Sequence, residues 1–256
     1  MNYYTEELIQ CKNCNNHFTG KFCNSCGQNS NTERINSHYI LHEIQHLVSH
    51  IDKGFLYTIK ELSINSGKAI REYIEGKRIN FFKPTSFIIL LSAIHIFLEH
   101  FSNKEPLVID FLLGLTSTLK DSQTEHQNLG LQTLNWLINN YSYTSLLLIP
   151  IFSVASYFAF RKSKYNFFEH LVLNTYTYGH ILFIFILLFP ISYFTQSDFK
   201  DYLQILILLG FTIWTFFTFF NDVKKINRIL NTIITFGIFL VLIGIGIMIL
   251  SIVSFI

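Results

Sequence analysis

Residues 229–256 contain no charged side chain, and this apolar run constrains the fold more than any other feature of the sequence. An α-helix rises about 1.5 Å per residue, so roughly 20 apolar residues cross the ~30 Å hydrocarbon core of a bilayer. Four further runs meet or approach that length, and the sequence therefore predicts an all-α membrane protein with about five transmembrane helices. The predicted spans lie near residues 84–101, 143–160, 171–194, 202–220 and 229–255.

A soluble helical protein is the main alternative for such apolar runs. Helices that pack on a soluble core carry a polar stripe at helical spacing, whereas the last three runs are apolar on every side. Charged residues make up 14% of the chain, against about 25% in a typical soluble domain. Length and the exclusion of charge therefore favour membrane spans over core helices.

Basic residues gather in alternate connections between these runs. The basic connections hold Lys68, Arg71, Lys77, Arg78, Lys83, Arg161, Lys162, Lys164, Lys224, Lys225 and Arg228. The opposite connections hold only Lys104, Lys120 and Lys200. Because cytoplasmic loops carry the excess of Lys and Arg, five alternating spans place the N-terminus in the cytoplasm and the C-terminus outside. The interval 102–142 is then external, and we expect an interfacial or packed amphipathic helix over residues 107–119, with a re-entrant segment as the less favoured alternative.

All four cysteines of the chain lie in two Cys-x-x-Cys pairs, Cys11 with Cys14 and Cys23 with Cys26. Two such pairs supply the four thiolates of a closed tetrahedral zinc site, which is structural because no position stays open for water. A reducing cytoplasm disfavours two disulfides, and the βαβ pattern around a redox Cys-x-x-Cys pair is absent from the sequence. Iron takes the same ligands in a rubredoxin-like site, but ligand type and compartment favour zinc.

Residues beside the cysteines fit such a knuckle. Asn15 and Gly27 each follow a cysteine pair, and both residue types tolerate the left-handed conformation that lets the chain leave a tight turn. Phe18 and Phe22 are expected to cover the small site. The sequence therefore divides into a zinc-binding knuckle at residues 1–36, cytoplasmic amphipathic basic helices at 37–83 and a transmembrane domain at 84–256.

Between the knuckle and the first span, apolar residues recur at helical spacing over residues 38–51, which predicts an amphipathic helix. Beside its apolar face runs a stripe of histidines, at His38, His42, His46 and His50. Two histidines four residues apart lie on one face of a helix and suit a second metal site. A helix that lies at an interface is favoured instead, because no carboxylate or cysteine accompanies the histidines.

A second amphipathic piece over residues 67–74 leads into a basic segment before the first span. Its cations are Arg71, Lys77, Arg78 and Lys83. Positive side chains at this depth are attracted to the anionic headgroups of the inner leaflet. We therefore expect an inner-leaflet basic patch formed by these four residues.

The order of these motifs is distinctive. The cysteine pairs end in Cys26-Gly-Gln, and His50-Ile-Asp-Lys-Gly-Phe and Arg71-Glu-Tyr-Ile-Glu-Gly-Lys-Arg follow before Pro84. Over roughly residues 11–100 the chain resembles DUF3667, a bacterial family of unknown function. That family often begins the intervening helix at a Pro-Gly pair, where this chain has Ser66-Gly67. The resemblance implies a zinc-ribbon-like head, several membrane helices and the bacterial cytoplasmic membrane, and it implies no known reaction.

Ionisable residues inside spans are candidates for function. His95 and Glu99 lie one helical turn apart in the first predicted span, and His180 lies inside the third. They suit a proton relay or a headgroup site. The favoured interpretation is simpler: Glu99 lies at the water interface, and His180 bonds to a neighbouring helix. Gly237 and Gly244 in the last span predict a close contact between helices.

Two functions are compatible with these features. The first is a membrane-anchored interaction or regulatory protein, whose zinc knuckle binds a cytoplasmic protein partner. The second is a membrane enzyme or transporter that acts on a lipidic or small substrate through His95, Glu99 and His180. The first is favoured, because the sequence contains no phosphate-binding loop, nucleophile elbow, metalloprotease helix or dinucleotide fingerprint. A net charge of +2 predicts no nucleic acid partner, and no oligomeric state is predicted.

Overall fold

The computed structural model describes residues 8–32, 34–45, 54–101, 136–137, 140–195 and 199–253. These residues are mostly helical, with a short antiparallel hairpin near the N-terminus. The elements are β1 (Ile9–Gln10), β2 (His17–Phe18), α1 (Ser37–Gln45), α2 (Gly54–Ile74), α3 (Pro84–Glu99), α6 (Tyr141–Ala159), α7 (Phe167–Thr195), α8 (Phe199–Phe219) and α9 (Lys225–Val253). His46, His50 and the helix predicted over residues 107–119 lie outside the described residues. The division of the chain at residues 36 and 83 stays a prediction.

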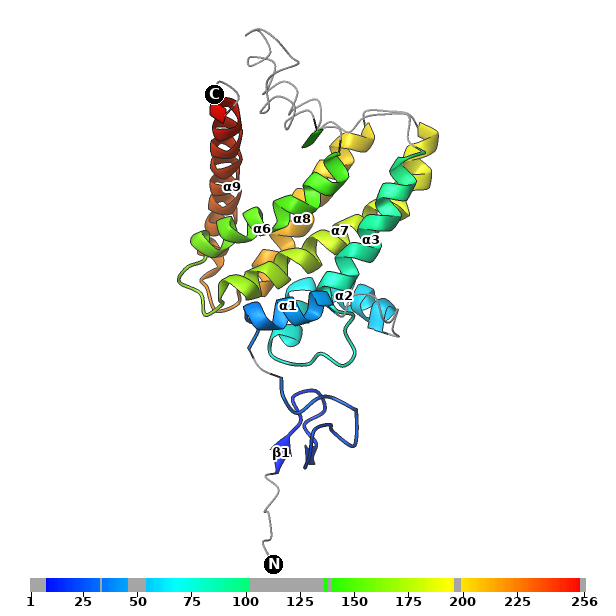
Figure 1. Ribbon diagram of the computed structural model, residues 1–256, viewed down its shortest axis with the longest axis vertical. Helices are drawn as coiled ribbons and strands as arrows, with labels where there is room; N and C mark the ends of the chain where they lie inside the picture. The colour runs from blue at the N-terminus through cyan, green and yellow to red at the C-terminus, as the bar shows by residue number, and fades with distance from the viewer. Residues whose placement is uncertain are drawn as a thin grey trace, which may run out of the picture.

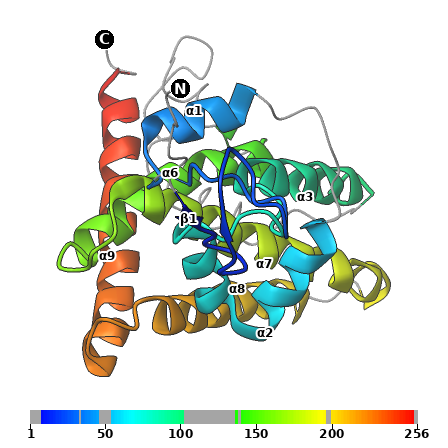
Figure 2. The same cartoon turned by 90° about the horizontal axis from the view of Figure 1, so that it is seen from below.

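The hairpin lies at one end of the molecule, and α1 and α2 cross between it and the longer helices (Figure 1). From there α3, α7 and α9 lead away from the hairpin, whereas α6 and α8 return toward it (Figure 1). Seen from below, α1 and α2 lie across the near ends of these helices, and α9 stands at the edge in both views (Figure 2). The hairpin and the C-terminal end of α9 therefore lie at opposite ends of the described structure (Figure 1).

Helix α2 consists of two pieces joined at Asn65, whose φ of −156° and ψ of 81° are not helical. The Asn65 side chain accepts a hydrogen bond from the Lys68 amide at 3.1 Å, which caps the second piece. The next two residues pack against the end of α8. Ser66 shares a 2.8 Å hydrogen bond with Thr215, and a Cβ at Gly67 would clash with the backbone there. The kink at Asn65 shows that the segment predicted over residues 67–74 belongs to a separate helical piece, which begins directly after Asn65.

An aromatic core joins α2 to the longer helices. The Tyr73 and Tyr176 rings lie 5.3 Å apart, and Phe87 packs beside Tyr176. All three side chains are fully buried. The Tyr176 hydroxyl donates a 2.5 Å hydrogen bond to the Phe82 carbonyl, just before Pro84 begins α3. The juxtamembrane segment is thus part of the same packed body as the bundle.

Three helices are long and apolar enough to cross a membrane, within Phe167–Ile191, Tyr202–Phe219 and Lys225–Ile249. The first two of the five predicted spans correspond instead to shorter apolar helical segments, Pro84–Glu99 in α3 and Leu146–Ala159 within α6. A 16-residue helix such as α3 rises only about 24 Å, less than the ~30 Å hydrocarbon core. The described residues therefore support three full-length spans rather than five.

Helix α9 has the most exposed apolar surface, with only 11% of its span buried. It packs on α6 through Phe236 and Phe239, whose rings lie 5.4 and 5.1 Å from that of Phe152. A Cβ at Gly237 or Gly244 would have no neighbour within 4 Å among the described residues. The close helix contact predicted at these glycines is therefore wrong for this part of the chain, because aromatic side chains make the contact.

Candidate metal centre

Two matching turns present the cysteine pairs. In the first, the Asn15 amide donates to the Cys11 carbonyl at 2.9 Å, and in the second the Gly27 amide donates to the Cys23 carbonyl at 2.8 Å. Asn15 and Gly27 then leave the turns with φ of 61° and 77°, in the left-handed region. The prediction made for both residues is confirmed, because an amide-bearing or glycine residue relieves the strain of this exit.

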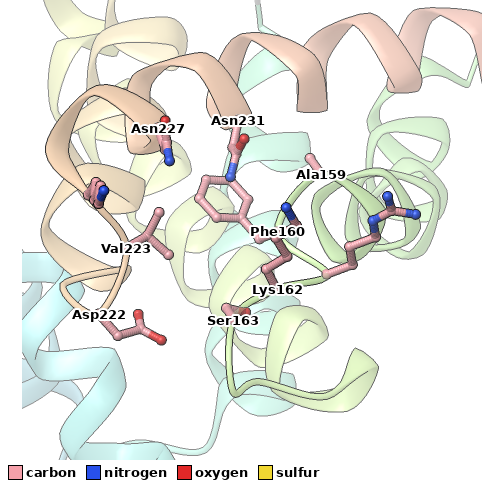
Figure 3. A pocket seen from close by; sticks show the side chains of 10 residues that line it. Ala159, Phe160, Lys162, Ser163, Asp222, Val223, Asn227 and Asn231 are labelled. Atoms are coloured by element: carbon pink, nitrogen blue, oxygen red, sulfur yellow. The ribbon is translucent and has the colours of Figure 1, made fainter.

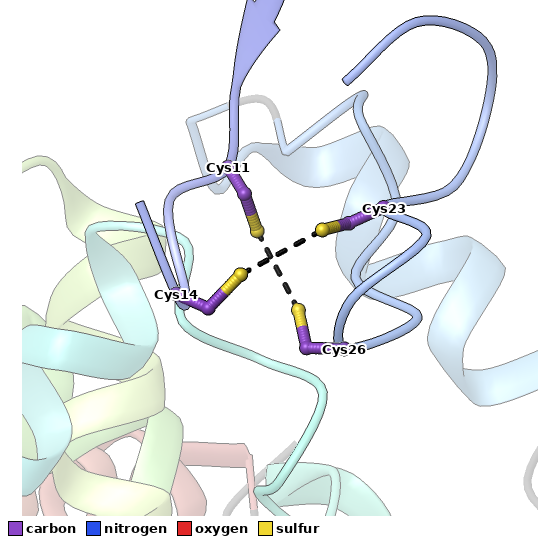
Figure 4. Close-up of side chains that lie close together, drawn as sticks. All are labelled: Cys11, Cys14, Cys23 and Cys26. Carbon is purple, nitrogen blue, oxygen red and sulfur yellow. Dashed lines mark hydrogen bonds between the residues drawn. The ribbon is translucent and has the colours of Figure 1, made fainter. Parts of the chain in front are cut away.

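The four sulfurs converge on one point (Figure 4). The Cys11 and Cys26 Sγ atoms lie 3.6 Å apart, as do those of Cys14 and Cys23, and all four lie within 4.8 Å of one another. A disulfide joins sulfurs at about 2.05 Å, so these are free thiols. Sulfurs at about 2.3 Å from a tetrahedral metal lie about 3.8 Å from each other, which fits this cluster.

The thiols do not share one environment. Burial raises the pKa of the Cys23 thiol, but hydrogen bonds from the Ser25 and Cys26 backbone outweigh it and lower the pKa to about 7. A hydrogen bond from the Asn16 backbone lowers the pKa of Cys14, but burial and the neighbouring thiols raise it to about 11. A metal must therefore displace protons from this cluster, which makes its affinity dependent on pH.

Only one of the two expected aromatic residues covers the site. Phe18 is buried and packs on Cys11 and Cys23, as predicted. Phe22 is 62% exposed, and the prediction that it covers the sulfurs is wrong. The Phe22 backbone pairs with Asn29 in a bridge, and its side chain is not part of the buried cluster around Cys11 and Cys23. Phe22 is consequently a large apolar group on the knuckle surface.

The knuckle is held on the helices by a residue that follows the last cysteine. The buried Gln28 side-chain oxygen accepts hydrogen bonds from the Arg78 and Ile79 amides, at 3.1 and 2.9 Å. Gly76, with a φ of 111°, allows the knuckle to approach closely, since a Cβ there would lie 2.8 Å from Lys12 Cδ and 3.0 Å from Thr32 Oγ1. The knuckle is therefore seated on the Gly-Lys-Arg turn, residues 76–78, which it contacts directly.

A second attachment joins the linker after the knuckle to the start of α7. The Arg34 guanidinium contacts both carboxylate oxygens of Glu169 at 2.8 Å, and the Asn166 amide donates to the Ile35 carbonyl at 3.0 Å. The hydrogen bond with Glu169 raises the pKa of Arg34. Sequence reasoning missed this pair, although a carboxylate next to a long apolar run is an available signal for a buried partner.

The four residues of the predicted basic patch have different surroundings. Arg71 donates to the Thr218 and Phe219 carbonyls at the C-terminal end of α8, the latter at 2.8 Å. Such a cation stabilises the negative end of a helix. Lys77 pairs with Glu72 at 3.0 Å.

The other two members differ from each other as well. The Arg78 guanidinium lies over the Tyr39 ring at 4.5 Å and near that of Tyr73, whereas Lys83 is exposed before α3. Three of the four cations therefore have partners inside the protein, and their contact with lipid stays a prediction.

The predicted intramembrane residues do not form one cluster. His95 Nε2 lies 3.6 Å from the Glu99 carboxylate on α3. His180 Nε2 lies 3.3 Å from the Ser63 hydroxyl, and its ring stacks on Phe211 at 4.9 Å. Among the described residues no hydrogen bond or ion pair joins His180 to His95 or Glu99. The contact of His180 with α2 and α8 matches the structural interpretation, and the enzyme or transporter hypothesis stays a prediction.

A buried polar network between α6 and α7 was not predicted. His170 Nδ1 lies 3.0 Å from the Ser156 hydroxyl, and the Asn174 amide donates to Ser153 and Ser156 at 3.0 Å each. All four side chains are buried. Small polar residues often bond across packed membrane helices, so Ser153 and Ser156 in an apolar run were the available signal.

Comparison with known families identifies the segment that holds the knuckle. Residues 52–96 match the model of a family described as "Protein of unknown function (DUF3667)". The chain carries a DUF3667 segment. Comparison with curated proteins and with solved structures gives no match. The DUF3667 segment comprises α2, the Gly-Lys-Arg turn and most of α3, and the four cysteines precede it. The predicted family is confirmed over a shorter range than residues 11–100.

Proposed function

We propose that this protein is a multi-pass protein of the bacterial cytoplasmic membrane whose N-terminal zinc knuckle is a docking module for a cytoplasmic protein. The observation that carries the proposal is the seating of the knuckle on the Gly-Lys-Arg turn by Gln28. A partner bound to a freely hanging knuckle would leave the helices unaffected. A partner bound to this knuckle is instead connected to the helices, because the knuckle contacts the turn at residues 76–78 and α3 begins shortly after that turn, at Pro84.

We further propose that α3 and α6 cross the membrane as well as the three long helices, because α3, α6, α7, α8 and α9 run in alternating directions (Figure 1). In this proposal the two shorter helices cross with the help of flanking polar side chains or a locally thinner bilayer. The basic connections after α6 and α8 then lie on the knuckle side, in the cytoplasm. Alkaline phosphatase fused at residue 256 is expected to be active and at residue 162 inactive. Activity at residue 162 would contradict the proposed orientation.

The sulfur geometry and a reducing compartment support zinc as the metal. A closed four-thiolate site supplies folding energy rather than chemistry. Elemental analysis of the purified chain is expected to find one zinc per chain, and none after Cys11 and Cys14 are replaced by Ser. Iron in place of zinc would overturn this assignment and leave the docking role open.

The outward-facing Phe22 supports a role in contact with a partner, because exposed aromatic residues are frequent anchors in interfaces. A photoreactive phenylalanine analogue at position 22 is expected to form a specific protein adduct in native membranes. The same analogue at exposed position 158 on α6 is the control. The adduct is expected to disappear when Cys11 and Cys14 become Ser. An adduct that persists without the metal site, or one formed equally from position 158, would contradict the proposal.

A further inference from the structure

A cavity of about 470 Å³ lies where the connection after α6 meets the start of α9 (Figure 3). Its charged lining consists of Arg161, Lys162 and Lys224 against the single carboxylate of Asp222. The cavity therefore has an excess of positive charge, and its size suits a small polar group. It is separate from the cysteine cluster and from the intramembrane histidines.

The cations around this cavity have no partner among the described residues. The other arginines of the chain, at positions 34, 71, 78 and 228, each donate hydrogen bonds within the protein. In the same described region the side chains of Arg161, Lys162 and Lys224 make no hydrogen bond or ion pair. Three neighbouring cations repel one another, so an anion between them lowers the electrostatic energy.

Neutral hydrogen-bond donors complete the lining. Asn227 and Asn231 come from successive turns of α9, so both amides border the same space (Figure 3). The Ser163 hydroxyl is buried and has no hydrogen-bond partner among the described residues. The first intrahelical bond of α9 runs from the Arg228 amide to Lys224, which leaves the amides before it available at the positive end of the helix.

The position of the cavity indicates where its anion comes from. The apolar span of α9 begins at Lys225, so the cavity lies at the depth of the headgroups. Phe160 and Val223 contribute apolar lining. The adjoining turns of α9 expose Ile226, Ile229 and Leu230. A ligand with a phosphate in the cavity and acyl chains along α9 satisfies both surfaces.

We propose that this cavity binds the phosphate headgroup of an anionic phospholipid. Arg161, Lys162 and Lys224 neutralise the phosphate, and Ser163, Asn227 and Asn231 donate hydrogen bonds to it or to the glycerol hydroxyls. Basic pockets between membrane helices on the cytoplasmic side bind the headgroups of anionic phospholipids. The proposal does not depend on the docking role of the knuckle, and each can fail without the other.

The test compares two charge-matched double variants of the full chain in phosphatidylcholine nanodiscs that contain spin-labelled phosphatidylglycerol. Lys162→Gln with Lys224→Gln removes two lining cations. Lys164→Gln with Lys225→Gln removes two cations one or two residues away that do not line the cavity. The first pair is expected to lower the preference for phosphatidylglycerol by roughly tenfold or more, and the second to change it little.

Equal losses in the two double variants would show diffuse attraction and overturn the proposal, as would a wild type without preference. Soluble glycerol 3-phosphate in large excess is expected to leave the preference unchanged. If it competes, the site binds soluble phosphates and the lipid assignment is wrong. Should the lining pair fail to insert, Asn231→Leu keeps every charge and is expected to weaken the preference. An unchanged preference in that variant would also overturn the proposal.

Discussion

Replacing Gly67 by Ala tests whether α2 and α8 pack as closely as the structure indicates. The added Cβ would lie closer than 3.0 Å to the backbone of Thr218 and Phe219, a separation that real Cβ atoms essentially never show. Ordinary contact begins at 3.4 Å, so the backbones of the two helices must move apart to admit the added Cβ. The clash involves backbone atoms, which cannot rotate out of the way as a flexible side chain can.

The cost follows from the contacts at this crossing. Overpacking typically destabilises by about 1–3 kcal/mol. Separation also weakens the Ser66–Thr215 hydrogen bond, worth about 1 kcal/mol, and the Arg71 contacts with the α8 carbonyls, worth about 1.5–3 kcal/mol. Alanine returns about 1 kcal/mol through its helix propensity. We expect a net loss of about 3 kcal/mol, or roughly a hundredfold shift toward the unfolded state.

The assay is unfolding in detergent micelles, followed by tryptophan fluorescence with Trp214 on α8 as a local reporter. Gly210→Ala on the same helix is the matched control, because a Cβ there meets no atom within 4 Å among the described residues. Gly210→Ala is expected to gain about 1 kcal/mol from the same helix propensity. If Gly67→Ala is as stable as the wild type or more stable, the close crossing of α2 and α8 is wrong.

Three further predictions concern the knuckle. Gln28→Leu removes the acceptor of two hydrogen bonds, worth about 2 kcal/mol in all, so limited proteolysis is expected to release the knuckle faster. Gln28→Glu keeps the acceptor and is the control. Equal rates of release for the two variants would refute the attachment of the knuckle through Gln28. As pH falls, protons compete for thiols such as Cys23, whose pKa is about 7, so metal affinity measured with a chromophoric chelator is expected to fall. An affinity independent of pH would exclude thiolate ligands. Arg34→Ala leaves the buried Glu169 carboxylate without its cation and is expected to lower the stability measured by thermal unfolding. The expected loss is only about 1–2 kcal/mol, because the Arg34 side chain is largely exposed and water screens the ion pair. Adding Glu169→Gln is expected to restore part of the loss, and no restoration would contradict the pairing.

Local patterns predicted the features that depend on few neighbours. The spacing of the cysteines and the residue types at Asn15 and Gly27 were sufficient to predict the two cysteine turns, because a tight turn is set by its own backbone. Length and composition likewise predicted the three long apolar helices. The span predicted over residues 84–101 was too long, since hydropathy does not show that α3 ends at Glu99.

The sequence by itself determined that an apolar helical protein carries a four-cysteine knuckle before its helices. Only the tertiary structure decided what its polar residues contact. Arg71, Lys77 and Arg78 form one basic run in the sequence, yet each has its own partner inside the protein. Arg161 and Lys224 lie in different connections, yet they line one cavity. The physical reason is that a charge's partner is set by distance in space, and packing fixes those distances only after the helices have met.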